Sequence, residues 1–89
     1  MRDDAVGLRA FVVVDSTRRG PAFGGIRRAR HADLGAARAE ACALARAMTL
    51  KCALAGLPAG GAKTVLVDHD GLDRVGTYTA LADAIEALV

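Results

Sequence analysis

The sequence has no tryptophan, and Phe11, Phe23 and Tyr78 are its only aromatic residues. Because 53% of its 89 residues are nevertheless hydrophobic, the core has to be built from alanine, valine, leucine and isoleucine, and alanine allows helices to approach closely. This composition predicts a globular chain and excludes an intrinsically disordered one. At this length we expect one small domain over residues 1–89, without room for a second.

The sequence also lacks the patterns of a metal site and of a membrane span. Cys42 and Cys52 are ten residues apart, form no CxxC motif and have no histidine pair nearby. They are therefore expected to be reduced, partly buried thiols in a cytoplasmic protein. No stretch approaches the ~18 apolar residues that a membrane helix needs, and no charged segment precedes an apolar run at the start. We expect no metal and no membrane partner, and we expect His31 and His69 to face solvent from polar loops.

Aromatic residues are missing from the one cluster of positive charge, which consists of Arg27, Arg28 and Arg30. Without interleaved aromatics or a long basic helix, this cluster is a weak indication of phosphate or nucleic-acid binding, and no nucleic-acid partner is expected. If such binding did occur, its affinity would fall steeply with salt.

The hydrophobic pattern predicts an α/β fold with a mixed sheet, the first two strands antiparallel, and helices packed on the sheet. Residues 1–7 are polar and are expected to be frayed. Residues 8–15, 26–29 and 62–68 are expected to form strands, because they hold short β-branched or alternating apolar runs. In the last of these, Lys63 should share one face with Val65 and Val67.

Two helices are expected, the first between Asp33 and Gly56 and the second over residues 72–89. Asp33 is a good N-cap, and no helix-breaking residue occurs before Gly56. If the apolar stripe of the first helix packs on the sheet, its next member, Lys51, points inward or into a cleft at the edge of the sheet. The alternative is a lysine that reaches water at the helix C-terminus, where the helix dipole favours a cation. The first stripe consists of Leu34, Ala37, Ala41, Leu44 and Met48, and the second, looser one of Leu72, Val75, Thr79, Ala82, Ile85 (or Glu86) and Val89.

Gly24 and Gly25 form a pair directly before a predicted strand. Glycines at this place weaken the strand unless a ligand or another segment must come close to the backbone. From spacing alone, a loop or a bulge is slightly favoured over a ligand contact.

Lysine is scarce as well, since Lys51 and Lys63 stand against ten arginines. The chain uses arginine where it needs only a solvated positive charge, so the two lysines indicate a need for an amine, which can lose a proton near neutral pH. A helix followed by a strand can bring both amines to one cleft. One of them can then hold an anion such as a carboxylate while the other acts as a general base.

Three motifs then stand out together: GPAFGGIR at residues 20–27, LARAMTLK at residues 44–51 and AGLPAGGAKTV at residues 55–65. In order and spacing they resemble the N-terminal dimerisation and substrate-binding domain of the glutamate/leucine/phenylalanine/valine dehydrogenase family. The resemblance implies an oxidoreductase of amino-acid metabolism that uses NAD or NADP, associates as a homodimer and acts on an amino acid or its 2-oxo acid.

The resemblance also implies a role for each matching residue. The lysine that matches Lys51 binds the substrate α-carboxylate, and the lysine that matches Lys63 performs acid–base catalysis at the α-carbon. Gly24, Gly25 and Met48 match residues that line the substrate pocket. Phe23 stands where glutamate-specific members carry a lysine for the distal carboxylate, so an apolar substrate of the leucine, valine or phenylalanine kind is expected.

The chain departs from the family pattern in two important ways. The catalytic aspartate of the family lies beyond the second helix, and no aspartate of this sequence occupies its motif. A G-x-G-x-x-G motif between a strand and a helix, typical of nicotinamide dinucleotide binding, is missing. Smaller departures are Cys52, where asparagine is frequent, and Ala62, where a third glycine is common.

Two functions are therefore open. In the first, the chain is a substrate-binding and dimerisation domain that binds no cofactor by itself and is inactive alone. A cofactor-binding domain is then possible on another chain. Alternatively, it is a stand-alone binding or oligomerisation module that is derived from the same family and has lost catalysis.

Overall fold

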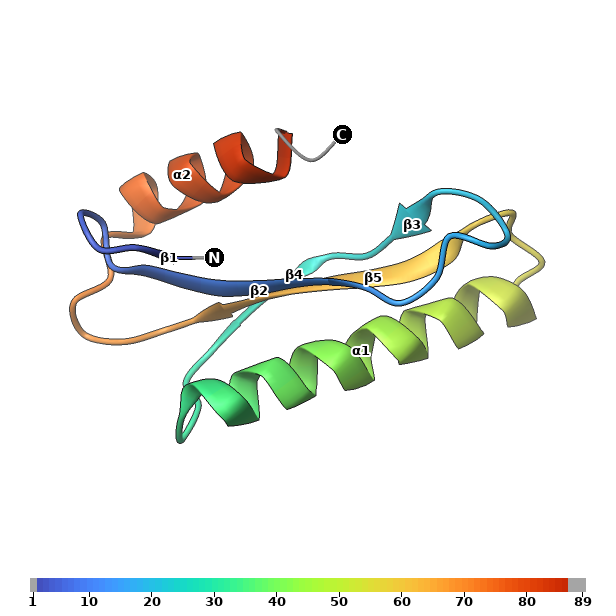
Figure 1. Cartoon of the computed structure of the whole chain (residues 1–89), viewed down its shortest axis with the longest axis horizontal. Coiled ribbons are helices and arrows are strands. Elements are labelled where there is room, and N and C mark those ends of the chain that lie inside the picture. Colours follow the sequence, from blue (N-terminus) through green and yellow to red (C-terminus); the bar gives the residue numbers. More distant parts are fainter. Residues whose placement is uncertain (1, 87–89) are drawn as a thin grey trace.

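The computed structural model describes residues 2–86, in which one mixed five-stranded sheet lies between two helices (Figure 1). Helix α1 covers one face of the sheet, and helix α2 lies on the other face near β1 and β2. The mixed α/β architecture expected from the sequence is confirmed. The elements in chain order are β1 (Arg2–Asp3), β2 (Leu8–Val14), β3 (Ala22–Phe23), β4 (Ile26–Ala29), α1 (Leu34–Leu54), β5 (Gly60–Val67) and α2 (Arg74–Glu86).

Strand β5 is the centre of the sheet. β2 pairs with it in the antiparallel direction, and β3 and β4 pair with it in the parallel direction. The two strands expected at residues 8–15 and 26–29 do run antiparallel to each other, but they are not neighbours because β5 lies between them. Val65 and Leu66 of β5 are completely buried, which is typical of a strand that is covered on both faces.

The N-terminal residues are ordered, and the expectation that they fray is wrong where the structure describes them. Arg2 pairs with Arg9, and Asp3 pairs with Leu8, so that β1 extends the sheet beside β2. Gly7 makes this tight turn possible because its φ of 74° lies in the left-handed region. Met1 lies outside the described residues.

Helix α1 begins and ends as the sequence predicts. The side chain of Asp33 accepts a hydrogen bond of 2.7 Å from the backbone N–H of Ala36. At the other end, Gly56 has a φ of 71° and donates to the carbonyl of Ala53, while Leu57 donates to that of Cys52. These two bonds form a Schellman motif, which satisfies carbonyl groups that the last turn leaves free.

The face of α1 that contacts the sheet contains Ala37, Ala41 and Leu44 of the predicted stripe, but not its first member. Its buried residues are Ala37, Ala41, Ala45 and Cys52, while Leu34 is exposed. Lys51 is also exposed, so the expectation that it points inward is wrong. It precedes the buried Cys52 by one residue and therefore lies about 100° around the helix from it.

The α2 side of the sheet has its own core, formed by Leu8, Ala10, Leu66 and Leu81. The stripe predicted for the second helix is wrong at Val75, which is 80% exposed, and it misses the buried Thr77 and Leu81. Its member Ile85 does pack against this core. The hydroxyl of Thr77 donates to the carbonyl of Val6 and fixes this orientation of the helix. Residues 87–89, and with them the predicted end of the stripe at Val89, lie outside the described residues.

Neither helix of the part that the structure describes is long and apolar enough to cross a membrane.

Candidate functional site

Lys63 lies on the face of β5 that is turned toward α1. Val65 and Val67 pack against Ala37 and Ala41 of α1, and residues two apart on a strand share a face. The predicted sharing of a face by these three β5 residues is thus confirmed. Lys63 is half-buried, and its Nζ lies 3.6 Å from the point that a β-carbon at Gly25 would occupy. The missing side chain of Gly25 therefore leaves space beside the Lys63 amine.

Gly24 has a different environment from Gly25. A β-carbon at Gly24 would lie 1.7 Å from the carbonyl oxygen of Ala62, so the backbone of β5 is the segment that comes close to it. The carbonyl of Gly25 accepts a 3.1 Å hydrogen bond from the N–H of Thr64. The glycine pair therefore joins the segment between β3 and β4 closely to β5.

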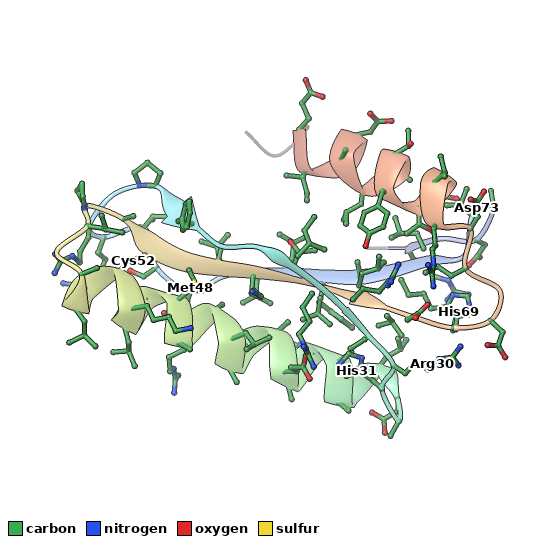
Figure 2. All side chains as sticks on the ribbon, turned by 180° about the vertical axis from the view of Figure 1, so that it is seen from behind. Arg30, His31, Met48, Cys52, His69 and Asp73 are labelled. Carbon is green, nitrogen blue, oxygen red and sulfur yellow. The ribbon has the colours of Figure 1, made fainter. Side chains whose placement is uncertain are left out.

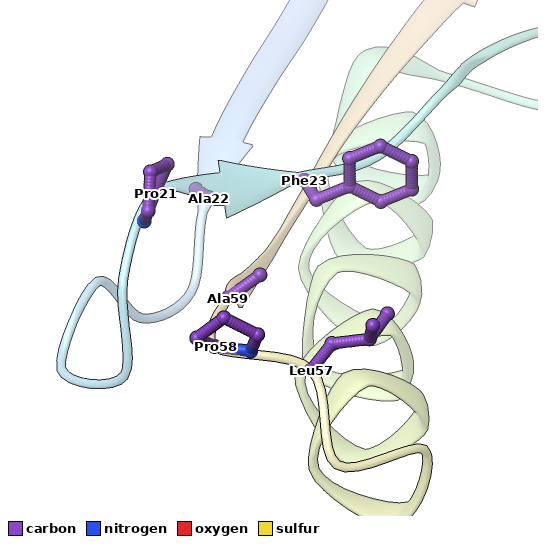
Figure 3. Close-up of a pocket in the computed structure, with 6 residues that line it drawn as sticks. All are labelled: Pro21, Ala22, Phe23, Leu57, Pro58 and Ala59. Atoms are coloured by element: carbon purple, nitrogen blue, oxygen red, sulfur yellow. The ribbon is translucent and has the colours of Figure 1, made fainter.

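Phe23 is the parallel partner of Gly61 in the register of β3 and β5. Phe23 is 63% exposed and lines an open pocket of about 310 Å³. Figure 3 shows that two short segments form this pocket, β3 with the residue before it and the loop between α1 and β5. All of its lining residues are apolar: Pro21, Ala22, Phe23, Leu57, Pro58 and Ala59.

The second half of α1 packs against the beginning of β5. A β-carbon at Gly61 would lie 2.2 Å from both the carbonyl oxygen of Ala45 and the nitrogen of Thr49. The buried Cys52 has its Sγ 3.8 Å from the carbonyl oxygen of Gly60, so its side chain fills this narrow contact. We call this contact, between residues 45–52 of α1 and 60–63 of β5, the α1–β5 junction.

Met48 belongs to the α1–β5 junction and is partly buried (Figure 2). Lys51 belongs to it as well, but its side chain is exposed to water. The structure thus brings Phe23, Gly25 and Lys63 together at the beginning of β5, with Met48 on the adjoining turn of α1.

Neither lysine has a carboxylate partner among the described residues. Within residues 2–86, neither the Lys51 nor the Lys63 ammonium group forms an ion pair or a hydrogen bond, and of the arginines only Arg2, Arg27 and Arg30 pair with a carboxylate. Cations without carboxylate partners attract an anion.

The arginine cluster is divided between the two faces of the sheet. Arg27 contacts Glu40 of α1 at 2.5 Å, and Arg30 contacts Asp70 at 2.5 Å. Arg28 alternates with Arg27 and lies on the opposite face. Each contact is a hydrogen bond to a carboxylate that lowers the pKa of the acid, Glu40 in one case and Asp70 in the other. The cluster does not form one basic surface.

Both histidines are less exposed than the sequence suggests, and the expectation that they face solvent is wrong. The His31 side chain is only 6% exposed, and its Nε2 lies 3.2 Å from Oε2 of Glu40 without hydrogen-bond geometry. His69 Nε2 lies 2.7 Å from the carbonyl oxygen of Gly7, and its Nδ1 accepts from the N–H of Gly71. Figure 2 shows both rings at the end of the sheet far from Met48. Gly7 lies 62 residues from His69 along the chain, so local sequence gives no sign of that contact.

A larger open hollow, of about 470 Å³, lies mainly on the opposite face of the sheet from α1. Val12, Val14, Thr64 and Ile85 line it, together with Gly24 and other small or apolar residues. No titratable side chain lines this hollow among the described residues. Size alone would favour this hollow as the binding site. The amine of Lys63, however, lies on the face toward α1, and we assign the candidate site to that face. Residues 2–86 contain no group of three or more metal-ligating side chains.

Comparison with known proteins supports the relationship that the three motifs indicate. The family model described as Glu/Leu/Phe/Val dehydrogenase, dimerisation domain, matches residues 1–89. The chain is 41% identical to leucine dehydrogenase of Bacillus subtilis (strain 168) over 73 residues, which are 82% of this chain and 20% of that protein. It is 46% identical to valine dehydrogenase of Streptomyces albus over 66 residues, which are 74% of this chain and 18% of that protein.

A solved structure agrees with these sequence relatives. The crystal structure of L-tryptophan dehydrogenase from Nostoc punctiforme matches with a TM-score of 0.74 and 33% identity, over 78% of this chain and 21% of that chain. The chain thus spans about a fifth of the length of these relatives. It belongs to the Glu/Leu/Phe/Val dehydrogenase family, in which it corresponds to the dimerisation domain.

Proposed function

We propose that this chain is the substrate-binding and dimerisation part of an NAD(P)-dependent dehydrogenase that oxidatively deaminates an apolar L-amino acid of the leucine, valine or phenylalanine kind. The observation that carries the proposal is the position of Lys63, half-buried beside Gly25 on the α1 face and without a carboxylate partner among residues 2–86. Membership of the family supports an amino-acid substrate.

Each residue of the site has a proposed task. Lys51 binds the α-carboxylate, for which an exposed ammonium group on a long flexible stem is suited. Lys63 moves a proton at the α-carbon and activates the water that attacks the imine, because an amine next to a strand backbone can be held against the reacting atom. Met48, Gly24, Gly25 and the ring of Phe23 border the substrate.

The apolar character of the substrate rests on Phe23. Its phenyl ring lines a pocket without charged residues, so it offers no partner for the distal carboxylate of glutamate. An uncompensated carboxylate against this surface would lose hydration. Leucine, valine and phenylalanine have no such group.

The residues of this chain do not fit a nicotinamide dinucleotide. A dinucleotide pyrophosphate is commonly bound at the N-terminus of a helix. Here the Asp33 carboxylate caps the start of α1 and accepts from Ala36, and Asp73 accepts from the N–H of Gly76 at the start of α2. Both carboxylates would repel a pyrophosphate. We therefore derive no hydride-transfer step on these residues, and we propose that the 89-residue chain is inactive alone.

Calorimetric titration of the chain with 4-methyl-2-oxopentanoate, the 2-oxo acid of leucine, tests the proposal. Binding is expected, and Lys51→Ala should weaken it while Arg46→Ala, which removes an exposed cation from the same helix, should not. Equal affinities of the wild type and Lys51→Ala would remove the carboxylate site and favour a non-catalytic module. Formation of NADH from leucine by the chain alone would contradict the proposed inactivity.

The proposed dimer has an independent test. Sedimentation equilibrium should give twice the mass of 9.1 kDa at micromolar concentration. A monomer at every accessible concentration would contradict this part of the proposal.

A further inference from the structure

The hydroxyl of Thr49 connects three elements at the α1–β5 junction. It lies 2.6 Å from Oδ2 of Asp15, and it accepts a 3.0 Å hydrogen bond from the backbone N–H of Gly61. The carbonyl oxygen of Ala45, one turn earlier on α1, is more distant at 3.3 Å. Because a hydroxyl has one hydrogen and the contact with the carboxylate is shorter and charge-assisted, the proton of Thr49 points to Asp15.

Asp15 closes these contacts into a ring. Its backbone N–H donates to the carbonyl of Gly61 at 2.8 Å, while its side chain accepts from Thr49. The N–H of Gly61 in turn donates to Thr49. Both backbone polar groups of Gly61 are thereby satisfied by residues just after β2 and on α1. A buried N–H that lost this partner would remain unsatisfied, which is costly.

Close packing makes the ring sensitive to small displacements. Gly61 is buried, and its missing side chain allows the backbone of α1 to come closer than any other residue would permit. Rotation or sliding of this part of α1 would break the bond from Gly61 or drive the helix into the strand. The ring therefore defines one position of the helix on the strand.

The ring lies next to the candidate site on both elements. Thr49 directly follows Met48 and precedes Lys51 by two residues, and Gly61 precedes Lys63 by two residues on the same face of β5. We infer that Thr49 is a positioning residue, which through Asp15 and Gly61 sets the placement of Met48 and Lys51 relative to Lys63. This inference rests on the proposed function for the substrate, but the placement itself can be measured without a substrate.

The test compares three variants by NMR and by titration with 4-methyl-2-oxopentanoate. Thr49→Val keeps the shape of the side chain and removes the hydroxyl, whereas Thr49→Ser keeps the hydroxyl. Thr79→Val is the matched control, because the Thr79 hydroxyl donates only to Val75 within α2. In Thr49→Val we expect faster exchange of the Gly61 amide, shifted resonances of the Met48 methyl and the Lys63 side chain, and about five- to tenfold weaker binding. Thr49→Ser should restore all of these, and Thr79→Val should change none.

The outcomes separate this inference from the proposed function. If the wild type does not bind the 2-oxo acid, the proposed function fails, and the Met48 and Lys63 resonances alone decide the inference. Unchanged resonances in a folded Thr49→Val would overturn it, as would unchanged affinity in a chain that binds. Should Thr49→Val fail to fold, Asp15→Asn decides in its place, since it retains an acceptor without the charge. In Asp15→Asn, smaller shifts of the Met48 and Lys63 resonances would support the inference, and unchanged resonances would overturn it.

Discussion

The two adjacent glycines at positions 24 and 25 are expected to respond very differently to the same substitution. A β-carbon at Gly24 would lie 1.7 Å from the oxygen and 2.5 Å from the carbon of the Ala62 carbonyl. At Gly25 the nearest atom is Nζ of Lys63 at 3.6 Å, which is an ordinary van der Waals contact. Real β-carbons essentially never approach closer than 3.0 Å. Gly24→Ala must therefore push two paired backbone segments apart by more than an ångström, whereas Gly25→Ala requires no movement.

The size of the difference follows from these contacts. Overpacking against a backbone that cannot yield costs about 1–3 kcal/mol, and in a domain of this length each kcal/mol lowers Tm by about 4–8 °C. At ~2 kcal/mol, Gly24→Ala should lower Tm by about 8–16 °C. Gly25 does not have a positive φ, so alanine fits its backbone, and the reduced freedom of the unfolded chain contributes about 0.4–1 kcal/mol. Gly25→Ala should leave Tm unchanged or raise it slightly.

Thermal unfolding followed by circular dichroism measures both variants in the same buffer. Urea unfolding is the second measurement, because it shows whether the change in Tm reflects a change in the free energy of unfolding. Equal melting temperatures for the two variants would refute the steric reasoning. Titration with the 2-oxo acid adds a separate readout, since the methyl group of Gly25→Ala narrows the space beside the Lys63 amine and should weaken binding without loss of stability.

Three further predictions concern the core, the helix cap and the dependence of stability on pH. Leu81→Ala should lower the free energy of unfolding in urea by about 2–5 kcal/mol because Leu81 is 1% exposed, whereas the exposed Val75→Ala should change it by less than about 0.5 kcal/mol. Asp33→Ala should cost about 1 kcal/mol through loss of the α1 cap, and Asp33→Asn much less. Arg27, and to a smaller extent His31, lowers the pKa of Glu40 below its ordinary 4.5, so this stabilisation is present above that pH and is lost as the pH falls through the lower folded value. Tm should therefore fall more in acid for the wild type than for Glu40→Gln.

Each of these has a result that contradicts it. The packing of α2 described above would be wrong if Leu81→Ala and Val75→Ala were equally stable. A cap at Asp33 is excluded if alanine and asparagine at this position give the same stability. If Tm falls equally with decreasing pH in the wild type and in Glu40→Gln, the ionised Glu40 side chain does not contribute to stability.

Local features of this chain were predictable from its sequence. The bounds of α1 follow from Asp33 and Gly56, because capping depends on residues within one turn of the helix end. The face of Lys63 follows from the alternation along β5. The family relationship indicated by the three motifs is confirmed by the family match, whereas the roles of the two lysines stay a prediction.

Features that depend on distant partners could not be predicted. The two residues of β3 form a strand only because β5 offers them Gly60 and Gly61 as partners. The predicted α1 stripe was wrong at Leu34, which is exposed. It missed the buried Ala45, whose carbonyl oxygen lies against Gly61 of β5, a contact that depends on a distant strand. For the ring at Thr49 there was no local signal, since its partners are 12 and 34 residues away along the chain.

The central position of β5 has a consequence for the order in which the chain can assemble. Within residues 2–86, β3 and β4 pair with no strand other than β5, and β2 has only the two-residue β1 besides. During synthesis from the N-terminus, these strands therefore have no β5 to pair with, and their edges stay unpaired until residues 60–67 have left the ribosome. Such edges readily pair with other chains. A chain that ends just before Gly60 should therefore need chaperones, whereas the sheet can form once residues 60–67 have emerged from the ribosome.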